Sequence, residues 1–474
     1  MKKWKAILAT LLVLCIIFMA GGCKPGTEPG GDPGTEPGDE SGDDPGTDDP
    51  GPEPSDDPGE DPDPESGDEP APDPLAVTPV PEDSIDLIDK AVIHLGDLWL
   101  GASGQFWRQT DSGDVTEIVW APNGYGLVYF RDSYPNKLGQ ELYYLALGET
   151  PVLLDKDVSA SYAWNNKDSW LWNPDSDFVA YAVGSGSEIV TVWMEDLSKT
   201  KLSLNKPCNL GPYWLSPGLL VYSTDAERPE VVVVNAIGQV QGGIADASLP
   251  YPLPEGLIVA TGVYDPDGAM DTFYYTGLSI ANDDGSGLAQ IYDIFNILHM
   301  DRDPVIPNNI GLPRYIALSD PENLFLQKYT GLISKGVPNR VDLLSQDMYL
   351  TYSEFAYPLW FSWAPDGQWI AALRYTATQT GNNNETGYWD LVLVNEKAVQ
   401  ELLLEKLYIV KSQEKPAPFQ GRLPLNWSQH SDYVNYLRDR KDGKGHDWWQ
   451  VNVKTGATAL VLEESGLPEY RPQP

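Results

Sequence analysis

The sequence predicts an all-β protein built from repeats, a β-propeller, and three observations carry this prediction. A phrase of Trp, one or two further residues, Pro, and Asp, Asn or Gly recurs along the chain, each time before a short apolar, β-prone run. The copies are roughly 40 to 65 residues apart, which suits a unit of four short strands. Long amphipathic helical patterns are scarce.

The best copy of the phrase runs from Phe361 to Ala371. Pro365 fixes φ for a turn, Asp366 can accept a backbone hydrogen bond, and Gly367 supplies a positive φ. Residues 369–375 follow as an apolar, β-prone run, which predicts a mostly buried strand. Related phrases begin at Trp120, Trp172, Trp214 and Trp427, with weaker copies near Gly256 and Tyr315.

The two ends of the repeat region predict how the ring closes. Residues 467–472 start another repeat with Tyr470 at the Trp position, whereas residues 98–100 and 105–108 are strand-like without an opening phrase. Strands from both termini that share one blade remove sheet edges. We therefore expect residues near 92–118 to close the ring with the C-terminal segment. The anchor count predicts seven blades, with six or eight as alternatives.

The first residues are typical of a secretory signal, with three early lysines and an apolar run from Ala6 to Ala20. The following stretch, Ala20-Gly21-Gly22-Cys23, resembles the lipobox of bacterial lipoproteins. In that family the Cys becomes the mature N-terminus and carries the lipids. The resemblance implies a signal peptide over residues 1–22 and lipid attachment at Cys23. The alternative is an ordinary signal peptide in which Cys23 has no role.

Residues 24–74 predict a disordered tether. They contain 19 Asp or Glu, one Lys, 14 Pro and 10 Gly, and no aromatic or large aliphatic residue. Such a composition cannot bury enough apolar surface to offset the entropy of ordering. Like charges and prolines extend the chain to a limit on the order of 150 Å. With Cys23 in front of it, this segment would hold a domain over residues 75–474 away from a membrane.

Charge and cysteine content narrow the function classes. The chain carries a net charge of −39, and residues 75–474 hold 24 net negative charges, which argues against binding of nucleic acid or anionic lipid. Cys208 is the one cysteine of that region, so neither an internal disulfide nor a cysteine metal cluster is expected there.

The repeat phrase before an Ile/Val-Ala strand resembles the TolB-type propeller repeat, a WD40-like repeat. Residues 282–287, Asn-Asp-Asp-Gly-Ser-Gly, are similar to the hairpin between later strands of that repeat. The resemblance covers about residues 115–470 in pieces. It implies a β-propeller whose motif is structural rather than catalytic. The helical domain that TolB has before its propeller is not seen in this sequence, so TolB's own role is not expected.

The sequence offers little that indicates catalysis. The four histidines lack ligand spacing, and there is no Gly-x-Ser-x-Gly elbow. Carboxylate groups are compatible with glycoside hydrolysis or calcium binding but are also expected in turns of an acidic protein. These groups are Asp265, Asp267 and Asp271, and Asp301 and Asp303. No catalytic, cofactor or metal residue is therefore predicted, and a structural calcium ion is kept as an alternative.

One short stretch is a candidate contact surface. Trp448 and Trp449 are adjacent on an expected strand, close to His446. Neighbouring strand residues point to opposite faces, so one of the two indoles is expected at the surface. The remaining tryptophans sit mostly at repeat anchors, where packing between blades explains them.

Together these features predict a monomeric, extracytoplasmic lipoprotein, anchored through Cys23 to the outer face of a bacterial cell membrane, in a host with a thick wall. Its propeller is expected to bind a protein or a cell-envelope component rather than to act as an enzyme. One alternative is a carbohydrate-active hydrolase or lyase of the envelope, with carboxylates in the propeller funnel. Another is a sensor or scaffold that docks a separate enzyme.

Overall fold

The computed structural model describes most of the chain after residue 76. The described residues are 77–78, 80–132, 139–159, 171–224, 226–253, 256–265, 272–292, 299–302, 314–319, 323–329, 340–345, 360–379, 386–395, 401–410, 424–440 and 445–472. The predicted signal peptide, Cys23 and the predicted tether lie outside these residues. No helix in the described part is long and apolar enough to cross a membrane.

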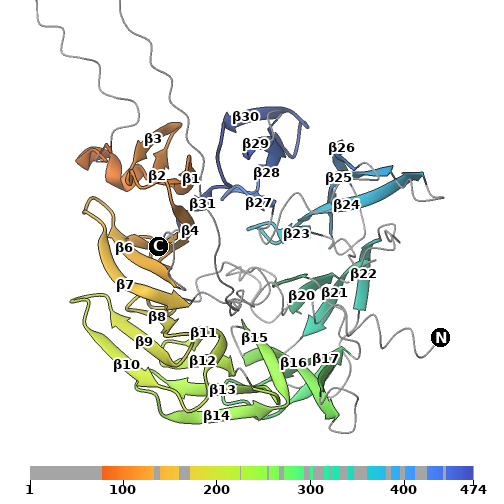
Figure 1. Ribbon diagram of the computed structural model, residues 1–474. Helices are drawn as coiled ribbons and strands as arrows, with labels where there is room; N and C mark the ends of the chain where they lie inside the picture. Colours follow the sequence, from red (N-terminus) through yellow and green to blue (C-terminus); the bar gives the residue numbers. More distant parts are fainter. Residues whose placement is uncertain are drawn as a thin grey trace, which may run out of the picture.

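The described strands form antiparallel sheets that follow one another around a ring (Figure 1), which confirms the predicted all-β propeller. Five consecutive sheets are four-stranded meanders, each with the strand order of one blade. Their strands are β11 (Cys208–Ser216), β12 (Leu219–Thr224), β13 (Glu230–Asn235) and β14 (Val240–Ala245); β15 (Ala247–Leu253), β16 (Gly256–Asp265), β17 (Thr272–Ala281) and β18 (Ala289–Tyr292); β19 (His299–Arg302), β20 (Arg314–Ser319), β21 (Asn323–Tyr329) and β22 (Arg340–Ser345); β23 (Trp360–Trp363), β24 (Ile370–Gln379), β25 (Thr386–Val394) and β26 (Glu401–Val410); β27 (Leu425–Trp427), β28 (Tyr433–Asp439), β29 (His446–Asn452) and β30 (Thr458–Leu462).

A sixth sheet has seven strands and consists of two successive meanders. Its strands are β4 (Val115–Trp120), β5 (Gly126–Asp132), β6 (Gln140–Ala146), β7 (Val152–Ser159), β8 (Phe178–Val183), β9 (Glu188–Trp193) and β10 (Lys199–Ser203). The meanders join where Val158 pairs with Val183 and Ser159 with Ala182. Trp172 forms an isolated bridge to Val179 and so lies beside the inner strand of the second meander.

The remaining sheet closes the ring with strands from both ends of the described chain, as predicted. Its order is β3-β2-β1-β31, formed by β3 (Gln105–Arg108), β2 (Asp97–Ala102), β1 (Lys90–His94) and β31 (Glu469–Tyr470). Lys90 pairs with Tyr470, and Figure 1 shows these strands beside β27–β30. The 3₁₀ helix η1 (Glu82–Leu87) precedes β1.

The predicted number of seven blades is not confirmed, because five sheets have the plain four-stranded form, one is the closing sheet and one joins two meanders. One weak repeat copy is also placed differently from the prediction. Tyr315 lies on β20, the second strand of its sheet, so the phrase around it does not open a blade.

Four of the repeat tryptophans join neighbouring units through hydrogen bonds. Each indole Nε1 donates a hydrogen bond to a backbone carbonyl of the preceding unit. The acceptor is always the residue immediately before that unit's own repeat aromatic residue, which is a Trp or, at the ring closure, Tyr470. Nε1 of Trp120, Trp172, Trp214 and Trp427 donates to the carbonyl oxygens of Glu469, Val119, Leu171 and Ser362 at 2.9, 3.3, 3.1 and 2.8 Å. The first of these bonds crosses the ring closure, so Tyr470 occupies a repeat position as predicted.

The predicted turn geometry is present as well. Gly367 has φ of 69°, and in two other copies a serine, Ser176 or Ser431, takes this left-handed position with φ of 65° or 58°. Each serine hydroxyl accepts a hydrogen bond from the backbone N–H of the preceding turn, from Asn123 at 2.9 Å and from Asp366 at 3.2 Å. The less favourable φ of these serines is thus accompanied by a bond between blades.

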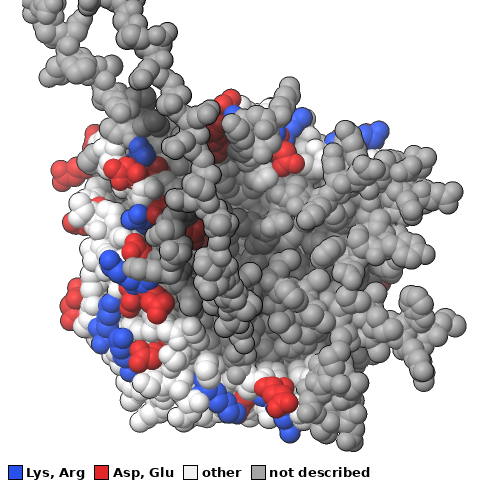
Figure 2. All heavy atoms as spheres, viewed as in Figure 1, with Lys and Arg blue, Asp and Glu red and all other residues white. Residues whose placement is uncertain are grey.

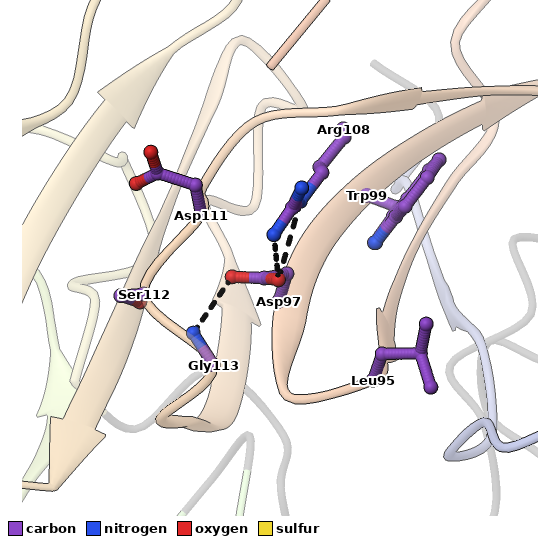
Figure 3. A pocket seen from close by; sticks show the side chains of 7 residues that line it. All are labelled: Leu95, Asp97, Trp99, Arg108, Asp111, Ser112 and Gly113. Carbon is purple, nitrogen blue, oxygen red and sulfur yellow. Dashed lines mark hydrogen bonds and ion pairs between the residues drawn. The ribbon is translucent and has the colours of Figure 1, made fainter. Parts of the chain in front are cut away.

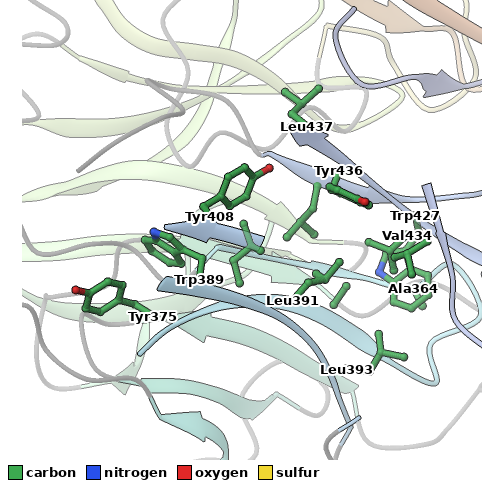
Figure 4. Close-up of a cluster of buried hydrophobic side chains, with 14 residues drawn as sticks. Ala364, Tyr375, Trp389, Leu391, Leu393, Tyr408, Trp427, Val434, Tyr436 and Leu437 are labelled. Carbon is green, nitrogen blue, oxygen red and sulfur yellow. The ribbon is translucent and has the colours of Figure 1, made fainter. Parts of the chain in front are cut away.

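Apolar side chains fill the spaces between blades. Figure 4 shows Tyr375, Trp389 and Leu391 of the β23–β26 blade together with Trp427 and Tyr436 of the next blade in one buried cluster. Neighbouring blades cover the two faces of a sheet in this way, so the described strands in the middle of a blade carry apolar residues on both faces.

Candidate functional site

The predicted contact surface lies on β29, and its two tryptophans differ in environment. Trp448 is only 1% exposed; its Nε1 donates to Oδ1 of Asn435 at 3.0 Å, and its ring meets Phe106 of the closing sheet edge-on. Trp448 therefore packs between blades, and its predicted place on a contact surface is not seen.

Trp449 and His446 remain nearer the surface. The Trp449 ring is half-buried, and the Arg438 guanidinium lies over it at 5.2 Å from the ring centre. Nδ1 of His446 lies 2.9 Å from Oδ1 of Asp439 on the neighbouring strand. A contact role for this pair of residues stays a prediction.

Other residues that the sequence analysis considered fall in three groups. Cys23 lies outside the described residues, and so do the side chains of Asp265, Asp267, Asp271, Asp301 and Asp303. Cys208 is buried, and burial raises the pKa of its thiol to about 12. Within the described residues no group of three or more His, Cys, Asp or Glu side chains is placed to hold a metal ion.

A pocket of about 220 Å³ lies in the closing blade, at the end of the sheet near the β1–β2 turn. It is formed by that turn, by β2 and β3, and by the loop that leads from β3 to β4 (Figure 3). The lining residues are Leu95, Asp97, Trp99, Arg108, Asp111, Ser112 and Gly113.

Asp97 holds the pocket together from below, and the residue is only 2% exposed. Its Oδ2 accepts two hydrogen bonds from Arg108, from Nη2 at 2.6 Å and from Nε at 3.2 Å. Its Oδ1 accepts from the Thr110 hydroxyl at 3.0 Å and from the backbone N–H of Gly113 at 2.9 Å. Figure 3 shows Asp97 between Arg108 and Gly113. A buried carboxylate satisfied by four donors fixes the loop against the sheet.

The rest of the wall combines polar and apolar groups. Trp99 is half-buried and makes an edge contact with His94 at 5.2 Å between ring centres. Its Nε1 is buried and has no hydrogen-bond partner among the described residues. Leu95 and Asp111 are exposed at the rim, and Ser112 is partly buried between them and the loop backbone.

The pocket adjoins the seam between the first and last blades. The backbone N–H of Leu95 donates to the Glu464 carbonyl at 3.2 Å, and Ser465 N–H donates to the His446 carbonyl at 3.0 Å. Along this seam the Arg440 guanidinium pairs with Asp447 at 3.1 Å and with Glu464 at 3.0 Å. The backbone of Glu464 and Ser465 thus lies between the pocket residue Leu95 and the predicted contact residue His446.

Sequence analysis missed the pocket. One signal was present, because Asp97 and Arg108 are charged residues at the ends of otherwise apolar strand segments, Asp97–Ala102 and Gln105–Arg108. Charged residues at strand ends are common, however, so this signal alone does not distinguish a pocket from an ordinary turn.

The visible surface shows no separation of charge. In Figure 2 lysine and arginine side chains alternate with aspartate and glutamate over the described blades. Several form ion pairs, for example Lys206 with Glu230 and Arg228 with Asp246.

No family model matches the chain, and no curated protein matches it. Solved structures show a distant similarity. An oligogalacturonate lyase from Vibrio parahaemolyticus is 13% identical, with a TM-score of 0.41 over 74% of this chain and 93% of that chain. The β-propeller domain of the Trilobed protease from Pyrococcus furiosus is 11% identical, with a TM-score of 0.42 over 74% and 98%. AztD from Citrobacter koseri is 9% identical, with a TM-score of 0.45 over 80% and 95%.

Proposed function

We propose that the protein is an extracytoplasmic bacterial lipoprotein whose propeller binds a protein or a cell-envelope component. The observation that carries the proposal is the order of three segments. Ala20-Gly21-Gly22-Cys23 ends an apolar leader, an acidic Pro- and Gly-rich stretch follows over residues 24–74, and a rigid all-β ring comes next. A lipid on Cys23 and an extended tether would give such a ring reach from the membrane while leaving its orientation free.

Binding is favoured over catalysis by what the described residues offer. The closing blade has a small pocket whose buried carboxylate, Asp97, already accepts four hydrogen bonds and is not available as a general base. The repeat tryptophans are engaged between blades. A rigid ring with differing loops suits recognition.

We further propose that the repeat is of the TolB type and that the ring has eight blades. The five four-stranded sheets, the closing sheet and the two meanders of the seven-stranded sheet make up this number. The indole bonds support the division of the seven-stranded sheet. Trp172 donates to Val119, and Trp214 donates to Leu171, so Leu171 and Trp172 occupy an inner-strand position between β4 and β11. An experimental structure that places seven blades or fewer around the ring contradicts the count.

The anchor is tested by lipid labelling in a bacterial host that processes lipoproteins. The expected result is incorporation of a labelled fatty acid into the wild-type chain and its loss in Cys23→Ser, with the variant released from the membrane fraction. Cys15→Ser is the matched control, because Cys15 lies inside the apolar leader and should leave labelling intact. A Cys23→Ser chain that is still labelled, or a wild-type chain that is never labelled, contradicts the proposal.

The binding role is tested by cross-linking the full chain in intact cells and isolating what is attached to it. A reproducible protein or envelope polymer that is absent with an unrelated tethered domain supports the proposal. Turnover of envelope glycans by the purified full chain, measured as release of reducing ends, supports the enzyme alternative and contradicts a purely binding role.

A further inference from the structure

We propose that the pocket of the closing blade binds one neutral sugar unit, either a free sugar or the end of an envelope glycan. This inference rests on the proposed function, because it names the ligand class of a binding propeller. It concerns the pocket lined by Leu95, Trp99, Arg108, Asp111, Ser112 and Gly113, with the buried Asp97 at its base.

The size of the pocket limits the ligand. Sites for drug-sized molecules occupy about 300–1,000 Å³, and a volume of about 220 Å³ is smaller than this range. A single six-membered ring with its hydroxyl groups matches that scale, whereas a peptide segment or a nucleotide requires more room. The pocket opens at Leu95 and Asp111, which are exposed, so the rest of a chain could continue into solvent.

The charge of the pocket argues for a neutral ligand. Arg108 and Asp97 form an ion pair at 2.6 Å, and they cancel each other. Asp111 adds one negative charge at the exposed rim, where water screens it. An anionic ligand would meet this carboxylate, and a cationic ligand would meet the guanidinium of Arg108.

The hydrogen-bonding groups suit hydroxyl groups, which both donate and accept. Asp111 supplies acceptors, and the Ser112 hydroxyl both donates and accepts. Arg108 contributes donors, since Nη1 is not used in the pairing with Asp97. Trp99 Nε1 is a further donor in the wall, and it lacks a partner among the described residues. A ligand oxygen that accepts from this indole satisfies a buried group that is otherwise left without a bond.

The apolar wall suits the C–H face of a sugar ring. The indole of Trp99 and the side chain of Leu95 lie on the side of the sheet, opposite Asp111 and Ser112 on the loop (Figure 3). An aromatic wall facing polar groups is an arrangement that contacts both the C–H face and the hydroxyl edge of one ring. The base is rigid, because Thr110 and Gly113 of the loop and Arg108 of β3 all donate hydrogen bonds to Asp97, so little ordering is needed on binding.

The test is a ligand-observed NMR titration of the purified full chain with glucose, galactose, mannose and N-acetylglucosamine. Glucosamine and galacturonate are the cationic and anionic comparisons. The expected result is binding of at least one neutral sugar with a Kd on the order of 1 mM, and weaker binding of both charged sugars. The methyl glycoside of the sugar that binds distinguishes the two sources. Retained binding identifies a chain end, and loss of binding identifies a free sugar.

The variants assign the binding to this pocket. Asp111→Asn and Ser112→Ala should each weaken it by about five- to tenfold, the effect of one hydrogen bond. Trp99→Phe keeps the aromatic wall and removes the indole N–H, and it should weaken binding by a similar factor. Asp175→Asn is the matched control, because Asp175 is an exposed aspartate on a turn that does not line the pocket.

Three results overturn the inference: no neutral sugar binds, a charged sugar binds more tightly, or Asp111→Asn and Ser112→Ala bind as the wild type does. In all three cases lipid labelling at Cys23 and capture of an envelope partner can still succeed. Failure of the pocket is therefore distinguishable from failure of the proposed function.

Discussion

Four of the repeat tryptophans do more at the residue scale than fill space, because the indole N–H groups of Trp120, Trp172, Trp214 and Trp427 each donate a hydrogen bond to the preceding unit. Trp172 is 2% exposed, and its Nε1 donates to the Val119 carbonyl at 3.3 Å. Trp172→Phe keeps most of the apolar contact but leaves that carbonyl without this donor. We expect a loss of about 1–3 kcal/mol in the free energy of unfolding, measured by urea denaturation.

Trp193→Phe is the matched control, because Trp193 is 46% exposed and its ring meets that of Phe178 edge-on at the surface. Its unfolding free energy should stay within about 0.5 kcal/mol of the wild type. Equal losses in the two variants would mean that indole area, and not the bond between blades, sets the contribution of Trp172.

At this scale the sequence predicted the anchors and missed what depends on tertiary contact. Pro365, Asp366 and Gly367 define a turn through local chemistry alone, so their role was predictable. The burial of Trp448 was not predictable. Strand alternation shows that Trp448 and Trp449 lie on opposite faces of the sheet, but it does not show which of these faces a neighbouring blade covers. In this fold the Phe106 side of the closing sheet covers Trp448. The Asp97 and Arg108 pair likewise joins separate strands.

At the scale of single elements, an ion pair in the β4–β5 hairpin makes the stability of the fold depend on pH. Asp114, just before β4, pairs with Arg131 of β5, with Nε to Oδ1 at 2.7 Å and Nη2 to Oδ2 at 3.0 Å. Burial alone would raise the pKa of Asp114, but the hydrogen bonds and the positive charge of Arg131 outweigh it and lower the pKa below the ordinary value of 3.8. The ionised carboxylate therefore stabilises the folded state above that value, and this contribution is lost as the pH falls through the lowered pKa.

Asp114→Asn should thus be less stable than the wild type at pH 7, by about 1 kcal/mol or less. The difference should shrink below about pH 4. Urea denaturation at pH 7, 5 and 3 measures it. In an Arg131→Gln background the same substitution should lose most of this pH dependence, because its partner is gone. A difference that is constant from pH 7 to pH 3 in the wild-type background would contradict the assignment.

Strand existence was predictable from apolar, β-prone runs, but the position of a strand within its blade was not. The phrase at Tyr315 ends in Ser319, Asp320 and Pro321, which is turn chemistry that suits any hairpin. The structure places Tyr315 on the second strand of its sheet. Turn residues specify that the chain reverses, whereas the packing of blades decides which two strands of a blade that turn connects. The blade number could not be read from anchor spacing for the same reason.

Closure of the ring is the feature of the whole molecule that the sequence predicted best. A blade shared by both termini joins the two ends of the ring in one sheet, and the pairing of Lys90 with Tyr470 has this form. The side chain that stabilises the closure was not predicted. Arg471 is 9% exposed and donates to the backbone carbonyls of Gly124 at 2.7 Å, Ile85 at 3.3 Å and Ile88 at 3.1 Å. One guanidinium thereby joins the C-terminal segment, a repeat turn and the C-terminal end of η1.

Arg471→Ala should destabilise the whole ring, because it removes three hydrogen bonds at the one place where the chain is not continuous between blades. Each buried carbonyl left without its donor costs about 1–3 kcal/mol, and the damage should begin at the β1–β31 pair. Arg471→Lys should fall between the variant and the wild type, because an ammonium keeps the charge but cannot reach three separated carbonyls with a rigid fork. Urea denaturation gives the free energy of unfolding, and hydrogen exchange at Lys90 and Ala91 reports opening of the closing sheet.

Arg438→Ala is the control, since Arg438 is exposed and its guanidinium lies over one ring, that of Trp449. If Arg471→Ala unfolds at the same urea concentration as Arg438→Ala, with unchanged exchange in β1, closure does not depend on the Arg471 guanidinium.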